Sequence, residues 1–174
     1  MNPGDRLIQV VYSSRYAIDI GQHIFSIEKY QHICDRLVAA THPRLISSVE
    51  PQVASLDQLA PAHTGSYLEK VHTLTLSPAE IAGLELPLTE AVVGGFRLMT
   101  GGTVTAASLA LADGIAAHIA GGFHHAFANH GEGFCLFNDV AVAIQVLRLE
   151  GAVSRTAVVD VDLDVHHGNG TAMI

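Results

Sequence analysis

The sequence has few charged residues and no long apolar run. Only 15% of its 174 residues are charged, and nine lysines and arginines face seventeen aspartates and glutamates, for a formal net charge of −8. A chain with so few cations offers no basic patch to phosphates, so we predict no nucleic-acid binding. It also lacks the run of about 18 apolar residues that a spanning helix needs, so we predict no membrane association.

Cysteine is scarce as well. The two cysteines, Cys34 and Cys135, are far apart and have no metal-type spacing, and we interpret Cys135 as a buried thiol. The first six residues lack the basic region and apolar core of a signal peptide. These features predict a cytoplasmic protein.

Apolar residues, in contrast, are abundant. They make up 49% of the chain, and the mean hydropathy of +0.33 is high for so few charges. The length suits one domain. We therefore expect apolar surface that needs a partner, and hence an oligomer.

The periodicity of these apolar residues predicts an α/β chain. Candidate strands are Leu7–Tyr12, Gln52–Leu56, Ile115–Ala120 and Thr156–Asp162. Candidate helices cover 27–40, 68–76, 79–84 and 138–150, with one bent helix or two helices over 89–112. Within that last stretch, we interpret Gly101 and Gly102 as positions of close helix packing.

The most informative segment runs from Val158 to Gly170, where a β-branched run with alternating aspartates precedes two histidines. This pattern predicts a buried parallel strand with polar groups at its carboxyl end, where open α/β sheets bind ligands. Asp164 and His166 are two residues apart, so on extended backbone they point to one side and can reach one divalent metal ion. On this segment alone, a loop of solvated charges remains the alternative.

A second polar cluster follows the candidate strand at 115–120. Two adjacent histidines, His124 and His125, come after a Gly-Gly pair. Glycine permits positive φ and close backbone approach, and histidine exchanges a proton near neutral pH. The alternative is a pair of loop histidines without a task, and that alternative predicts no second acidic strand end to orient them.

Three segments together resemble the zinc-dependent histone deacetylase family, in its bacterial and class IV-like branch. They are Gly-Gly-Phe-His-His-Ala at 121–126, Gly-Glu-Gly-Phe-Cys-Leu-Phe-Asn-Asp at 131–139 and Asp-Leu-Asp-Val-His-His-Gly-Asn-Gly at 162–170. Weaker likeness at 25–30, 63–67 and 101–103 extends the resemblance over nearly the whole chain. It implies a partial arginase/deacetylase-type α/β fold, three-layered with a mostly parallel sheet and truncated after the fourth family strand.

The resemblance also implies a metal centre. Asp164 and His166 match two of the family's three zinc ligands. Backbone carbonyls around Asp162, Asp164 and His166 match those that hold a monovalent cation, K+, in the family.

Catalytic roles follow from the same match. His124 and His125 match the tandem histidines that activate the zinc-bound water and protonate the leaving amine. Asp162 matches the carboxylate that orients the first histidine, and Asn169 stands where the second finds its partner.

A substrate tunnel is implied as well. Gly133 and Phe134 match the wall of the narrow tunnel that admits an acetyl-lysine side chain, and His63 matches a position near the tunnel rim. The implied substrate is an acetylated amine, either acetyl-lysine or an acetylpolyamine, and the family's name does not make it a histone.

The sequence departs from the family in one respect. The third zinc ligand, an aspartate, and the oxyanion-stabilising tyrosine both belong downstream of the 162–170 motif, and the chain holds neither. Catalytic zinc sites generally use three protein ligands. We therefore expect residues 1–174 to form the N-terminal portion of a deacetylase-like domain, with weak zinc binding and slow hydrolysis on its own.

The family's strand order, 2-1-3-8-7-4-5-6, adds an expectation about assembly. Two strands that this chain does not hold separate the third strand from the fourth. An unpaired gap would be left in the sheet, so we expect a homo-oligomer, with or without strand swapping, to fill it.

Two other functions remain as alternatives. One is a non-catalytic, truncated homologue that acts as a binding or oligomerising module. The other is an arginase-like metallohydrolase, which the aromatic segment at 131–135 disfavours because a guanidine substrate needs no such slot.

Overall fold

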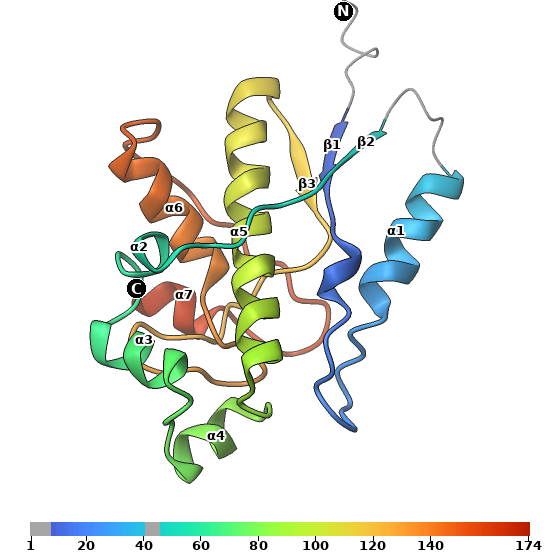
Figure 1. Cartoon of the computed structure of the whole chain (residues 1–174). Coiled ribbons are helices and arrows are strands. Elements are labelled where there is room, and N and C mark those ends of the chain that lie inside the picture. The colour runs from blue at the N-terminus through green and yellow to red at the C-terminus, as the bar shows by residue number, and fades with distance from the viewer. Residues whose placement is uncertain (1–7, 41–45) are drawn as a thin grey trace, which may run out of the picture.

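A short parallel sheet lies at the centre of the computed structural model, which describes residues 8–40 and 46–174. Its strands are β1 (Ile8–Val11), β2 (Ile46–Val49) and β3 (Ala116–His118). They are hydrogen-bonded in the order β2-β1-β3, and Val10 of β1 pairs with Ser48 on one side and Ala117 on the other (Figure 1). The parallel α/β sheet that the sequence predicts is thus confirmed.

The helices surround this sheet. They are the 3-10 helix η2 (Ser14–Tyr16), α1 (Lys29–Ala40), α2 (Leu56–Leu59), α3 (Gly65–His72), α4 (Pro78–Leu84), α5 (Glu90–Asp113), α6 (Asp139–Leu149) and α7 (Asn169–Met173). Side-chain caps begin several of them. The Ser77 hydroxyl accepts from the Glu80 N–H, and the Asn138 side chain accepts from the Ala141 N–H.

Helix α5 organises the layers. It packs against β1 and β3, while α6 packs along α5 and α1 lies beyond the strands on the other side (Figure 1). Contrary to the predicted bend or break, α5 is one helix that runs through Gly101 and Gly102. A Cβ at Gly101 would collide with the Gln52 carbonyl, so this glycine admits an extended segment rather than another helix.

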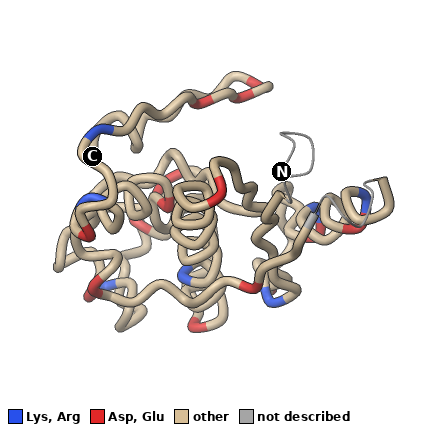
Figure 2. Tube along the Cα trace, turned by 90° about the horizontal axis from the view of Figure 1, so that it is seen from above, with Lys and Arg blue, Asp and Glu red and all other residues tan. Residues whose placement is uncertain are grey.

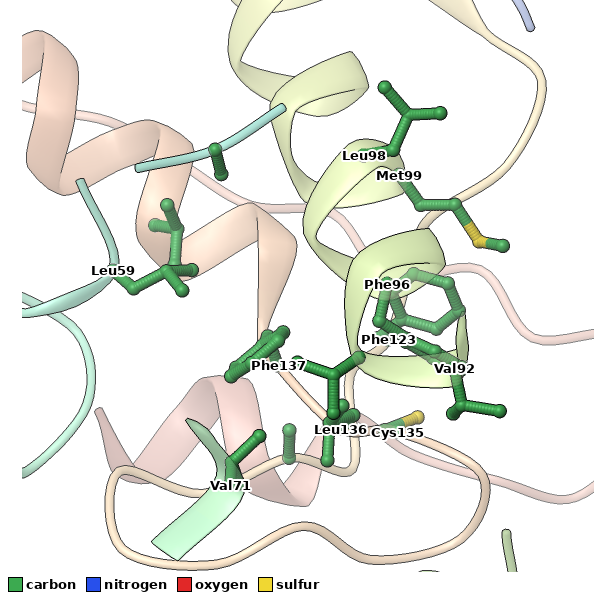
Figure 3. Close-up of a cluster of buried hydrophobic side chains, with 14 of the residues drawn as sticks. Leu59, Val71, Val92, Phe96, Leu98, Met99, Phe123, Cys135, Leu136 and Phe137 are labelled. Carbon is green, nitrogen blue, oxygen red and sulfur yellow. The ribbon is translucent and has the colours of Figure 1, made fainter. Parts of the chain in front are cut away.

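The core extends from α5 to the loop between β3 and α6. Figure 3 shows Phe96 and Met99 of α5 beside Phe123, Leu136 and Phe137 of that loop, and all five side chains are buried. The rings of Phe96 and Phe123 lie 4.8 Å apart. Because side chains near both ends of the loop pack in this core, its backbone is held against α5.

Two of the four predicted strands are confirmed as β1 and β3, although Leu7 lies outside the described residues. The prediction of a strand at Gln52–Leu56 is wrong, because that stretch is a loop whose Ala54 N–H donates to the Arg97 carbonyl. The prediction at Thr156–Asp162 is also wrong. No described strand lies beside this exposed segment to exchange the N–H and C=O bonds of a ladder.

No helix among the described residues combines the length and the apolarity needed to cross a bilayer.

Candidate metal and catalytic site

The two tandem histidines lie in the loop that follows β3. Gly121 and Gly122 both have positive φ, +87° and +75°, and they turn the chain immediately before His124. The His124 N–H then donates to the Gly122 carbonyl at 2.8 Å. The rings of His124 and His125 lie 4.3 Å apart, so the structure presents the two imidazoles side by side.

His125 bonds to the first residue of α7. Its Nδ1 lies 2.6 Å from Asn169 Oδ1, and the Asn169 Nδ2 donates to Glu132 Oε1 at 3.2 Å. Since the amide nitrogen is engaged by a carboxylate, the amide oxygen must accept from the His125 Nδ1–H. Asn169 is the partner that the family motif predicts for the second histidine, and the structure brings the two side chains together.

Helix α7 is itself anchored to the histidine loop. The Thr171 N–H donates to the His124 carbonyl at 3.1 Å, and Asn138 Nδ2 donates to the Ala126 carbonyl and to the Thr171 hydroxyl. A Cβ at Gly170 would collide with the Ala126 carbonyl. Glycine at this position therefore allows α7 to lie directly on the loop.

His124 bonds to a different aspartate from the one that the sequence analysis named. Its Nδ1 lies 2.7 Å from Asp160 Oδ2, where the prediction placed Asp162. Asp160 belongs to the same run of alternating aspartates, but the match to the family motif pointed to Asp162. Glu132, which engages Asn169, was not singled out at all.

Asp162 instead joins the predicted zinc ligands. Ligand atoms of Asp162, Asp164 and His166 all lie within 4.8 Å of one another, and the three residues are exposed. Asp162 Oδ1 accepts from the Asp164 N–H at 2.7 Å, and this bond lowers the pKa of the Asp162 carboxyl. Two carboxylates and one imidazole are ligand types that Zn²⁺ accepts, so the donor set fits this metal.

The histidine pair and the candidate metal ligands are neighbours. The rings of His125 and His166 lie 5.5 Å apart. A reacting group bound at Asp164 and His166 would therefore lie beside the tandem histidines.

Gly133 and Phe134, the two residues predicted to form a tunnel wall, follow the tandem histidines in the chain. Gly133 has φ +51°, and its backbone is held by an N–H bond to the Gly83 carbonyl. A Cβ at Gly133 would come 3.1 Å from the His125 ring. The Phe134 ring lies 4.5 Å from the His23 ring and 6.0 Å from that of Phe25, so it belongs to an aromatic cluster with these two side chains.

His63 lies apart from this surface. It is 3% exposed, its Nδ1 bonds to the Phe127 carbonyl, and its Nε2 accepts from the Asn138 N–H. Burial lowers the pKa of the ring to about 4. A neutral imidazole with both nitrogens bonded to the main chain is not available to substrate, so the position disagrees with the prediction of a tunnel-rim contact.

Cys135 is buried, as the sequence predicts, and burial raises the pKa of its thiol to about 12. A thiol that stays protonated is a poor nucleophile and a poor metal ligand.

Comparison with known families gives one clear match. The model of the histone deacetylase domain matches residues 23–174. An uncharacterized protein of Picosynechococcus sp. is 35% identical over 95% of this chain and 55% of its own length. Histone deacetylase 2 of Arabidopsis thaliana is 34% identical over 94% of this chain and 44% of its own length. The chain therefore spans about half the length of these relatives.

Two further matches agree. The acetoin utilization protein AcuC of Bacillus subtilis is 34% identical over 70% of this chain and 33% of its own length. The crystal structure of the HDA15 HD domain superposes with a TM-score of 0.71 at 20% identity, over 98% of this chain and 50% of that one. This structural likeness concerns the fold alone. The family match covers most of the sequence, and the chain belongs to the histone deacetylase family.

Proposed function

We propose that the chain is the N-terminal part of a metal-dependent hydrolase that removes acetyl groups from amines, of the acetyl-lysine or acetylpolyamine type. The observation that carries this proposal is the pair His124 and His125. Each bonds its own acceptor through Nδ1, and the pair lies beside Asp164 and His166.

The chain's own residues can handle the protons of such a reaction. The bond from His124 Nδ1–H to the Asp160 carboxylate leaves Nε2 free as an acceptor and stabilises the imidazolium that forms. The partner of His125 is a neutral amide, whereas that of His124 is a carboxylate. His124 would take a proton from the attacking water, and the pair would return one to the leaving amine.

Asp164 and His166 would hold the metal, with Asp162 beside them. A bound zinc ion would polarise the acyl carbonyl and lower the pKa of a water molecule. The third family ligand and the oxyanion tyrosine are not among residues 1–174. A monovalent cation on the carbonyls of these three residues stays a prediction.

Gly133 and Phe134 would form one wall of the substrate tunnel. The place of Gly133 beside His125 supports this, and the next residue, Phe134, offers an aromatic ring on which the aliphatic part of an acetyl-lysine side chain would pack. The net charge of −8 suits a substrate that carries positive charge elsewhere.

One observation favours a second candidate function, a binding or oligomerising module. Val159, Leu163 and Val165 are 83%, 93% and 86% exposed on a segment that has no strand partner among the described residues. In Figure 2, the segment that contains them runs clear of the helices. A second copy of the chain that paired with this segment would cover those side chains.

Native mass spectrometry of the chain with added zinc, followed by an acetyl-lysine peptide assay, tests both candidates. We expect one zinc ion per chain, loss of that ion in Asp164→Asn, and retention in Asp57→Asn, an exposed carboxylate of α2. Hydrolysis that Asp164→Asn and His124→Ala abolish would support the deacetylase. A dimer that binds no zinc would support the module instead, and zinc binding that Asp164→Asn leaves unchanged would contradict the metal site.

A further inference from the structure

Behind the tandem histidines lies a buried carboxylate that the proposed reaction does not use. Asp139 begins α6 and is fully buried. Its Oδ1 accepts from the Phe123 N–H at 2.8 Å, and its Oδ2 accepts from the Gly122 N–H at 3.0 Å and from the Thr103 hydroxyl. The two backbone donors are the residues that immediately precede His124.

The bonds continue into the core. The Thr103 hydroxyl lies 2.9 Å from His118 Nδ1, and His118 Nε2 lies 2.8 Å from the Tyr16 hydroxyl. Burial lowers the pKa of His118 to about 4, so the ring is neutral. Because the Thr103 hydroxyl donates to Asp139, it must accept from the His118 Nδ1–H, and Nε2 must accept from Tyr16. One chain of donors thus runs from η2 through β3 and α5 to the carboxylate.

Two glycines leave room for this network. A Cβ at Gly121 would collide with Asp139 Oδ2 and come 2.8 Å from the Thr103 hydroxyl oxygen. A Cβ at Gly102 would collide with His118 Nε2 and the Tyr16 hydroxyl. The glycine before the histidine pair and the glycine within α5 therefore serve the same set of bonds.

Burying a carboxylate costs desolvation free energy, which its hydrogen bonds must offset. Desolvation raises the pKa of Asp139, and an apolar side chain would fill the volume without that cost. The bonds have a specific target, because the Gly122 carbonyl accepts the His124 N–H at 2.8 Å. The Gly122 carbonyl shares a peptide group with the Phe123 N–H, so the bond from that N–H to Asp139 Oδ1 sets the peptide to which His124 is bonded.

We propose that Asp139, Thr103 and His118 form a positioning network that sets the backbone before His124 and, through it, the placement of both tandem imidazoles. This inference rests on the proposed function, because the positions of the two imidazoles matter only if they take part in the reaction. None of the three residues touches the reacting atoms.

The test uses the full chain and compares Asp139→Asn and Thr103→Val with a matched control. Thr100→Val makes the same change on the same helix, at a buried hydroxyl that bonds only to the Phe96 carbonyl within α5. Amide hydrogen exchange at Gly122 and Phe123 and the ¹⁵N spectra of the histidine rings are recorded for each variant.

We expect exchange at Gly122 and Phe123 to speed up about tenfold in Asp139→Asn and Thr103→Val, the loss typical of one hydrogen bond, with no change in Thr100→Val. The Nδ1–H signals of His124 and His125 should average toward mixed tautomers in the same two variants. Thr103→Ser, which keeps the hydroxyl, should restore both readouts if Thr103→Val fails to fold.

Exchange rates and ring signals that stay unchanged in folded Asp139→Asn and Thr103→Val would overturn the positioning role. These readouts need neither zinc nor turnover, so they separate the two proposals. If exchange speeds up as expected but the chain never hydrolyses an acetyl amide, the positioning network is supported and the proposed function is contradicted. Where hydrolysis is measurable, Asp139→Asn should lower kcat and leave KM unchanged.

Discussion

The loop between β3 and α6 and the segment at 156–167 supply the two halves of the proposed site, but they are supported very differently. The loop is packed under α5 and bonded to Asp139, Asn138 and α7. The segment is exposed along its length and has no strand partner among the described residues. The half proposed to handle protons is thus held by the chain's own core, whereas the half proposed to bind metal has suitable residue types without the same support.

The difference shows that a segment can carry suitable residue types without the packing that fixes where their side chains lie. Burial and bonded main chain place His124 and His125. The placement of Asp164 and His166 rests on local turns such as the bond from the Asp164 N–H to Asp162. The same type of substitution should therefore lower the free energy of unfolding strongly at the loop and its bonded partners, and only weakly in the segment at 156–167.

The largest contrast is expected between Asp139→Ala and Asp164→Ala. The first leaves two backbone N–H groups and one hydroxyl without an acceptor in a buried place, so it should lower the free energy of unfolding by about 4 kcal/mol. The second removes an exposed carboxylate and should change that free energy by less than about 0.5 kcal/mol. Urea denaturation followed by circular dichroism measures both, and equal losses would contradict the comparison.

A second matched pair removes apolar side chains. Leu136 is 0% exposed and Leu163 is 93% exposed. Leu136→Ala should cost about 3 kcal/mol because it removes buried methyl groups and leaves a cavity, while Leu163→Ala should be close to neutral. A shift in the urea midpoint for Leu163→Ala as large as that for Leu136→Ala would show that the segment is packed in solution, against this chain or against a second copy.

The third prediction concerns the pH dependence of stability. The pKa of buried His63 is lowered from 6.5 to about 4, so the unfolded chain binds a proton over that range while the folded chain does not. Stability contributed by the neutral ring is complete above pH 6.5 and should be lost by about 1.4 kcal/mol per pH unit as the pH falls toward 4. His118 acts in the same direction, and the raised pKa of Asp139 acts in the opposite one.

His63→Gln isolates the contribution of His63. Glutamine can donate to the Phe127 carbonyl and accept from the Asn138 N–H, but it does not titrate. We expect the difference in unfolding free energy between the two proteins to narrow between pH 7 and pH 5. A constant difference over that range would mean that His63 is solvated and belongs to the exposed half of the comparison.

Local pattern was sufficient to find the strands β1 and β3 and the start of α6 at its Asn138 cap. Each of these depends on residues close in sequence or on an apolar run. The motifs at 121–126 and 162–170 led to the histidine loop and the acidic cluster, which the structure places side by side. Asp164 and His166, paired by their spacing, lie within reach of one another in the structure, but on a bend rather than on the predicted strand.

Other features could not be predicted because they depend on contacts distant in sequence. The choice of Asp160 over Asp162 as partner of His124 follows from the path of a segment that no strand holds in register. The burial of His63 follows from its bond to Asn138, which is 75 residues away. Asp139 and Thr103 lie in segments that resemble the family, at 131–139 and 101–103, but the sequence assigned no role to either, because their bond joins residues 36 positions apart.

The smallest expected effect is that of zinc, and it tests whether the segment can acquire the support that the loop already has. Three exposed ligands should bind zinc weakly, and at ten times the Kd the ion would add about 1.4 kcal/mol to the free energy of unfolding. Thermal unfolding with zinc and after its removal by EDTA measures this gain, and His166→Gln should abolish it. If His166→Gln gains as much as the unaltered chain, the ion acts elsewhere. If the gain depends on His166, zinc orders the exposed half around its own ligands, and the two halves then differ only in whether side chains or an ion provide the bonds.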